Sequence, residues 1–223
     1  TLSEQFLIDR RLPALATYGY TLLTNQDPTN LYPHNKKVNS DKVYLDSVKN
    51  DITQLTYLKS IYVNVLPYEH QPIFRFFFLY QAIEMLMELI FEIEQSKTID
   101  RLLQAKGDTV LTKDILSEMN QNTSEKKRMS LMVQRYCMCD RDTKNIIDSC
   151  KDLLKDLEIN LDGDPINLES SLYKVRNFLF HKFHNYPKHA DEKLEVIVLD
   201  FLEFLSLALA KFCNPYTAEK TDP

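Results

Sequence analysis

Residues 73–95, IFRFFFLYQAIEMLMELIFEIEQ, decide the fold class of this chain, because they are apolar on nearly every face of a helix. They follow Pro72, a residue that suits the first turn of a helix. The stretch is long enough to cross a membrane, but Arg75 and several glutamates interrupt it, and each charge would cost roughly a few kcal/mol in hydrocarbon. We therefore predict the central helix of a helical bundle and expect no membrane as a partner.

Four polar residues on the middle turns of this helix form one narrow stripe. At 100° per residue they fall within about 80° of one another on a rod that is otherwise apolar. They are Gln81, Glu84, Glu88 and Glu92. Glu84 and Glu88 are spaced like the carboxylates of a di-iron bundle, but such a site also needs Glu-x-x-His pairs, which the sequence lacks. We expect no metal and no cofactor.

The rest of the chain divides according to its prolines, none of which occurs from residue 73 to 164. Uninterrupted helices are therefore allowed there, since an internal proline costs roughly 3 kcal/mol. We predict helices at 99–106, 111–119, 124–137 and 141–158, a turn at 161–165, and two further helices at 167–186 and 190–213.

The N-terminal region has a different composition. The stretches 15–24 and 55–66 are rich in Tyr, Thr, Val and Ile, which favour strands, and 25–42 is polar and turn-rich. We thus predict a mainly α fold: a mixed α+β segment at 1–71 where short strands can form, a helical bundle over 72–213, and a frayed tail at 214–223.

Composition excludes several functional classes. Only three glycines occur, too few for a glycine-rich phosphate loop, and a net charge of −5 gives no overall attraction to nucleic acid. The four cysteines show no CxxC spacing, which indicates buried thiols in a reducing, cytoplasmic compartment. The chain begins at Thr1 without a signal-type apolar segment, and we expect it to be cut from a longer product.

The segment 170–190, SSLYKVRNFLFHKFHNYPKHA, is a local cationic island in this acidic protein. It has no acidic residue and holds three of the five histidines of the chain. Its cationic and titratable side chains are Lys174, Arg176, His181, Lys182, His184, Lys188 and His189. Any contact with RNA is expected here, with 125–128 as a further basic stretch.

A helical projection separates a core stripe from a polar face in this segment. The core stripe consists of Leu172, Val175, Leu179, Phe183 and Tyr186. On the opposite side Asn177, His181 and His184 fall within about 60° of one another, with Arg176 on the shoulder between. Phe178 and Phe180 flank the stripe, which gives the helix more apolar surface than one neighbour needs.

These residue types suit RNA cleavage by the 2′-hydroxyl group of the RNA itself. That reaction needs a base for the hydroxyl proton, an acid for the leaving oxygen and a cation for the charge on phosphorus. Histidine can be base or acid near neutral pH, and arginine offers a fork that matches phosphate oxygens. No metal is required.

The sequence Arg176-Asn177-Phe178-Leu179-Phe180-His181 resembles the motif of the HEPN superfamily, in which arginine and a polar residue precede a histidine by five and four positions. HEPN proteins are helical bundles, and many are ribonuclease toxins or antiviral effectors. The resemblance implies a metal-independent endoribonuclease in which two motif copies face each other in a homodimer. It also implies toxin–antitoxin or phage-defence biology and an antitoxin or regulatory partner.

Carried over by position, Arg176 would hold the phosphate, Asn177 would position it and His181 would be the general acid/base. Glu84 would orient Arg176 or His181, as an acidic residue does in some relatives, and His184 would support the site. The expected RNA-binding residues are Lys174, Lys182 and Lys188. Some relatives have a tyrosine two residues after the histidine, where this chain has Phe183.

The sequence is also compatible with three alternatives in which the segment 170–190 is not a catalytic site. Arg176 and His181 could be an incidental pair on a solvated helix face. The domain could be a non-catalytic HEPN-like module that binds a nucleotide or a protein. It could also be a helical scaffold whose segment 170–190 merely attracts acidic partners.

Overall fold

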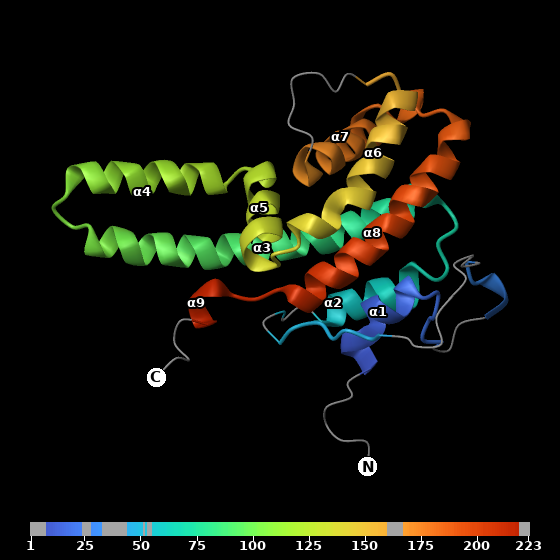
Figure 1. Ribbon diagram of the computed structural model, residues 1–223, viewed down its shortest axis with the longest axis horizontal. Coiled ribbons are helices and arrows are strands. Elements are labelled where there is room, and N and C mark those ends of the chain that lie inside the picture. Colours follow the sequence, from blue (N-terminus) through green and yellow to red (C-terminus); the bar gives the residue numbers. More distant parts are fainter. Residues whose placement is uncertain are drawn as a thin grey trace, which may run out of the picture.

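The computed structural model describes residues 8–23, 28–32, 44–50, 52, 55–159 and 167–218, and these are mainly helical, without a strand among them (Figure 1). The predicted turn at 161–165 and most of the loop at 25–42 lie outside the described residues. The α-helices are α1 (Leu12–Thr17), α2 (Leu55–Ser60), α3 (Pro72–Gln104), α4 (Thr109–Asn122), α5 (Glu125–Leu131), α6 (Lys144–Asp156), α7 (Leu168–His181), α8 (Asp191–Lys211) and α9 (Pro215–Ala218).

The core forms where α3 is covered on several sides. Helix α8 crosses α3, α6 packs on α8 and on α7, and α1 packs on the other side of α8 (Figure 1). Most apolar side chains in the middle of α3 are buried between these helices, as are the facing residues of α8. This explains why both sequences are apolar almost all round. Within the described residues, no helix combines the length and hydrophobicity that a bilayer crossing needs.

The predicted N-terminal strands are wrong. The stretch 15–24 begins inside α1, and 55–66 forms α2 followed by a π-helical turn at Ile61–Val65. Strand preference measures how well a side chain packs on a half-buried sheet, and tertiary packing overrides it here. Leu12 and Leu58 are buried in the same apolar cluster as α3 and α8, so the helical form has a core to join.

Helix α7 ends five residues before its predicted end at 186. Lys182 leaves helical geometry with φ −128°, and a 3-10 turn at Phe183–Asn185 follows. Tyr186 is extended (φ −74°, ψ 117°), the conformation that a following proline imposes. Within the helix the predicted core stripe therefore ends at Leu179, and Phe183 is 54% exposed instead of buried. Tyr186 packs against the core partly buried, from beyond the end of the helix.

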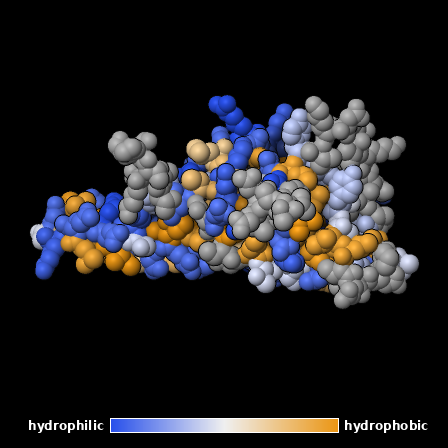
Figure 2. Space-filling model, turned by 90° about the horizontal axis from the view of Figure 1, so that it is seen from below, coloured by the Kyte–Doolittle hydropathy of each residue, from blue (hydrophilic) through white to orange (hydrophobic). Residues whose placement is uncertain are grey.

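Helix α3 is longer than predicted and continues through the expected separate helix at 99–106. Beyond it the chain reverses at Gly107, whose φ of 97° is a left-handed conformation that glycine adopts without strain. Asp108 then begins α4 by accepting hydrogen bonds from the backbone N–H groups of Val110 and Leu111 at 3.0 and 2.9 Å. The end of α3 and α4 form a helical arm that extends from the body (Figure 1), with apolar side chains on its surface (Figure 2).

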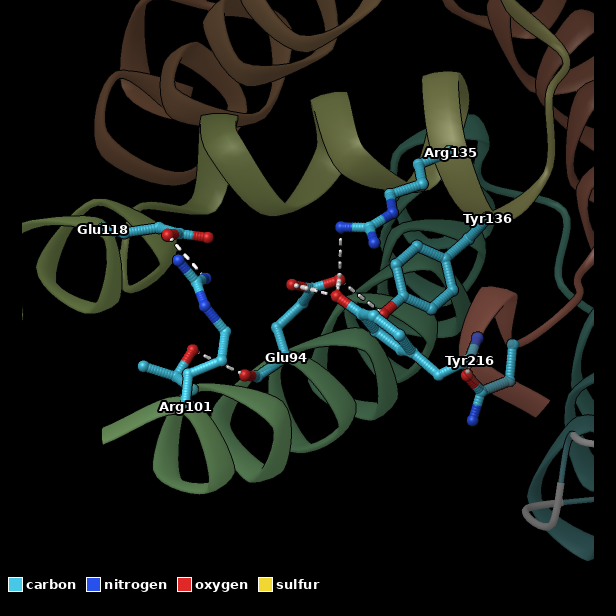
Figure 3. A network of polar contacts seen from close by, with 8 residues as sticks. Glu94, Arg101, Glu118, Arg135, Tyr136 and Tyr216 are labelled. Atoms are coloured by element: carbon cyan, nitrogen blue, oxygen red, sulfur yellow. Dashed lines mark hydrogen bonds and ion pairs between the residues drawn. The ribbon is translucent and has the colours of Figure 1, made fainter. Parts of the chain in front are cut away.

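A buried carboxylate joins the C-terminal segment to α3 (Figure 3). The Glu94 side chain accepts hydrogen bonds from the hydroxyl of Tyr136 at 2.7 Å, from the hydroxyl of Tyr216 at 3.1 Å and from Arg135 at 3.2 Å. Three donors replace the water that Glu94 loses on burial. Residues from the π-helical turn Met132–Tyr136, which follows α5, and from α9 are thereby held at one turn of α3.

Replacing Asp108 with alanine removes the two capping hydrogen bonds and should destabilise the chain by about 1 kcal/mol. Chemical denaturation measures the change. The matched control is Asp114→Ala, which removes the same charge from an exposed position inside α4 and should leave stability nearly unchanged. Equal effects of both variants would mean that capping does not hold the arm.

Candidate functional site

Helix α7 presents the sequence motif next to the middle of α3. The helix begins at Asn167, whose side-chain oxygen accepts a hydrogen bond from the backbone N–H of Ser170 at 3.0 Å. Leu172, Val175 and Leu179 are buried and fix the rotation of the helix. With that face committed to the core, Arg176 and Asn177 are left half-buried at its border and His181 is exposed at its C-terminal end.

The Arg176 guanidinium is held by contacts from two helices. Its Nη1 donates to Oδ1 of Asn177 at 3.1 Å, and its Nη2 lies 4.0 Å from Oε1 of Glu84 on α3. The guanidinium also covers the ring of Phe180, with its carbon 4.6 Å from the ring centroid. Glu84 therefore lies within the outer limit of an ion pair with Arg176, whose closer partner is Asn177.

The environment of Glu84 favours its neutral form more than water does. Partial burial raises the pKa of Glu84, and the nearby carboxylate of Glu125 raises it further, while Arg176 opposes both. The Glu84 side chain is 44% exposed, so solvent screens much of the electrostatic effect on its pKa. The carboxylate can thus brace Arg176 without cancelling its charge.

Asn177 connects Arg176 to the side of the helix that carries His181. His181 lies one turn after Asn177, about 40° away around the helix axis, whereas Arg176 and His181 leave the axis about 140° apart. His181 is exposed and forms no hydrogen bond or ion pair with the described residues. Within one copy of the chain, Arg176 and Asn177 are therefore held in place by contacts, whereas the side chain of His181 is exposed to solvent.

The other predicted residues are spread along α7 and the segment that follows it. His184 lies in the 3-10 turn after α7, so the projection that grouped it with Asn177 and His181 does not apply. Lys182 is exposed next to His181, and Lys174 is half-buried within α7. Lys188 begins the short 3-10 helix Lys188–Ala190, and its side chain is outside the described part.

Residues of the polar stripe of α3 form polar contacts with three other helices. Gln81 accepts from the hydroxyl of Tyr57 at 3.1 Å, and Glu88 pairs with Arg128 at 3.2 Å. Glu84 lies between these two contacts and pairs with Arg176. The stripe that the sequence showed thus marks where α2, α7 and α5 meet α3, with Glu92 left exposed.

Sequence reasoning missed Tyr80 and Glu125, which lie beside Arg176. The Tyr80 hydroxyl donates a short hydrogen bond to Oε1 of Glu125, and its ring centroid is 6.0 Å from the Arg176 guanidinium. Burial, followed by this hydrogen bond, raises the pKa of Tyr80 well above its ordinary value. No signal in the sequence connects these residues, because they are 45 positions apart in an ordinary core helix and a charged helix.

A surface pocket lies at the end of α7. Phe178, Lys182, Asn185 and Pro187 line one side of it, and residues 156–159 line the other. It includes neither Arg176 nor His181, so the motif does not form this pocket. Among the described residues, no three His, Cys, Asp or Glu side chains gather as metal ligands would.

Comparison with protein-family models, curated proteins and solved structures finds no significant match to this chain.

Replacing Tyr80 with phenylalanine should destabilise the chain by about 1–2 kcal/mol at neutral pH, because the donor to Glu125 is lost. The folded-state pKa of Tyr80 is raised above 10.0, so its contribution is complete below pH 10 and is lost as the pH rises beyond it. Denaturation of both proteins at several pH values should show their difference shrinking above pH 10. The control is Tyr20→Phe, which alters an exposed ring and should leave the free energy of unfolding at neutral pH unchanged. If the difference in stability between wild type and Tyr80→Phe grew with pH, this explanation would be wrong.

Proposed function

We propose that this chain is a metal-independent endoribonuclease of the HEPN type. The observation that carries the proposal is the Arg176 guanidinium, braced by Glu84 and hydrogen-bonded to Asn177, with an exposed imidazole one turn beyond the asparagine. A positioned guanidinium beside a solvent-accessible histidine supplies the phosphate clamp and the acid/base group of 2′-hydroxyl attack.

In this reaction His181 takes the proton of the 2′-hydroxyl or gives one to the leaving 5′-oxygen. Arg176 stabilises the charge that builds on the phosphate oxygens, and Asn177 orients the phosphate through its amide. Glu84 is a positioning residue, because it touches the guanidinium and not the RNA. Rotating Arg176 toward a phosphate exchanges the long Glu84 contact for a stronger one.

A second copy of the chain completes the site in this proposal. In one concerted in-line step the base and the acid stand on opposite sides of the phosphate, so a single histidine cannot be both at once. Arg176 and His181 also leave α7 about 140° apart. Two copies related by a two-fold axis would supply two histidines and two arginines to one cleft. Phe180 and Phe183 are 52% and 54% exposed beside His181, and they are the apolar surface that such a contact would cover.

The RNA backbone would follow the exposed cations that continue from the motif. Lys182 and His184 directly follow His181 and are exposed. On the neighbouring helix α5, Lys126 lies 5.2 Å from the centroid of the Tyr173 ring of α7, so the basic stretch 125–128 borders the motif helix. These groups give an acidic protein a local path for phosphates.

A non-catalytic binding module is the second candidate, and the position of Arg176 favours it. Only 24% of the Arg176 side chain is exposed, and its guanidinium already has a carboxylate, an amide and a ring as partners. In such a module Arg176 would be a structural tie between α7 and α3. The two candidates differ in whether His181 is needed for RNA turnover.

Cleavage of a mixed RNA substrate without added metal tests the enzyme. Wild type should cleave it, and His181→Ala should lose about 10²–10⁴-fold of the rate. Arg176→Lys should also lose activity, because lysine keeps the charge but not the fork. His70→Ala, an exposed histidine far from α7 in the sequence, is the matched control and should be fully active. Equal rates for wild type and His181→Ala would leave only the binding module.

Sedimentation velocity tests the shared cleft. Wild type should dimerise at micromolar concentration, and Phe183→Glu should be monomeric, because two carboxylates would be buried at the two-fold axis. Leu103→Glu, which alters an apolar residue 72% exposed on the arm, is the control and should remain dimeric. A monomeric wild type, or loss of the dimer only in the arm variant, would refute an interface through α7.

A further inference from the structure

Three of the four cysteines come together where α8 ends, although they are far apart in the sequence. The backbone N–H of Cys213 donates to the carbonyl of Tyr136 at 2.9 Å, which brings Cys213 beside the residue before Cys137. Cys137, Met138 and Cys213 line one surface pocket together with Lys211 and Phe212. Cys150 is buried elsewhere, within α6.

The three thiols differ in their access to solvent. Cys213 is exposed, whereas Cys137 and Cys139 are 1% and 0% exposed. Met138 between them is 68% exposed and has a φ of 46°, a left-handed conformation that is rare for a residue with a Cβ. This bend turns the methionine outward and both flanking thiols inward.

The thiol of Cys137 donates a hydrogen bond to the carbonyl oxygen of Ala208, which lies 3.4 Å from its Sγ. The neighbouring Cys139 and burial both raise the pKa of Cys137, while Cys137 lowers the pKa of Cys139. Cys137 and Cys213 line the same pocket.

We propose that this pocket is a thiol–disulfide exchange site, in which Cys213 reacts with a low-molecular-weight disulfide such as oxidised glutathione and Cys137 then closes a Cys137–Cys213 disulfide. Disulfides need Cα separations of about 4.4–6.8 Å, and the backbone hydrogen bond beside Cys137 brings the two residues into this neighbourhood. The inference does not depend on ribonuclease activity.

The exchange proceeds in two balanced steps. The Cys213 thiolate attacks one sulfur of the small disulfide, an S–S bond forms on Cys213, and one glutathione thiolate leaves. Cys137 then attacks the Cys213 sulfur, and the second glutathione leaves with the proton that Cys137 loses. Overall two protein thiols are oxidised to one disulfide, and one molecule of oxidised glutathione is reduced to two thiols.

The pocket suits an anionic reagent. Lys49 and Lys211 line it, and each carries a positive charge that attracts the carboxylates of glutathione. Lys211 is also held at its rim by Asp142 at 2.9 Å. The reagent would thus meet two cations next to the exposed Cys213 thiol.

Non-reducing peptide mapping of the full chain tests the proposal. The chain is incubated with oxidised glutathione, its free thiols are alkylated, and it is digested with trypsin. We expect peptide 136–141, YCMCDR, to be linked to peptide 212–220, FCNPYTAEK, and the link to disappear on reduction. Peptide 145–151, which holds Cys150, should be alkylated and unlinked, as the internal control.

Two variants separate the roles of the thiols. Cys213→Ser alters an exposed residue and should abolish both the link and the mixed disulfide. Cys137→Ser should leave Cys213 carrying glutathione without a link. The proposal is overturned if wild type stays unlinked, if Cys213 stops at the mixed disulfide, or if the bridge joins Cys137 to Cys139 within one peptide.

Discussion

Helix α3 carries two charged side chains into the interior, Arg75 and Glu94, and each is paired with a residue from a distant part of the chain. This constraint orients the elements that pack around α3. An unpaired charge in a protein core costs several kcal/mol, so each such group on a buried helix requires a complementary group from elsewhere. Arg75 pairs with Glu195 of α8, and Glu94 accepts hydrogen bonds from Tyr136 and Tyr216. The remaining polar contacts of α3 lie at its partly or fully exposed border: Gln81 with Tyr57 of α2, Glu84 with Arg176 of α7, Glu88 with Arg128 of α5, and Arg101 with Glu118 of α4.

These contacts supply what the apolar surface of α3 cannot. Hydrophobic burial is nearly independent of direction, so a rod that is apolar all round does not determine which helix covers which turn. A carboxylate at one turn of α3 does determine which helix packs there, because only a hydrogen-bond donor at the same position along the helix axis can pair with it. Arg75 is fully buried; its Nη1 donates to Glu195 at 2.7 Å, and its guanidinium carbon lies 3.8 Å from the centroid of the Tyr32 ring, while its Nε and Nη2 form no hydrogen bond with the described residues.

The sequence predicted the parts of the fold that depend on periodicity. It identified α3, the polar stripe on it, the late helices and the contact of Glu84 with Arg176. It did not predict the N-terminal helices, because residues such as Tyr62 and Val63 favour strands until a core is available to them. It misplaced the end of α7, since the effect of Pro187 reaches back over several residues. It also missed Glu94 and its partners, which lie too far apart in the chain for any local pattern to connect them.

The same pairing rule bears on what Arg176 can do. A guanidinium held only by Glu84 would be a structural tie, but its distance of 4.0 Å from that carboxylate is long for a strong ion pair. Its firmer bond is to Asn177, a neighbour on its own helix, so most of its partners would move with α7. A phosphate could therefore compete with Glu84 for the arginine without separating α7 from α3, because Phe180 still packs against Phe77, with the ring centroids 4.4 Å apart and the rings tilted by 47°. The apolar contact holds the helices together, which leaves the charge of Arg176 available for a ligand.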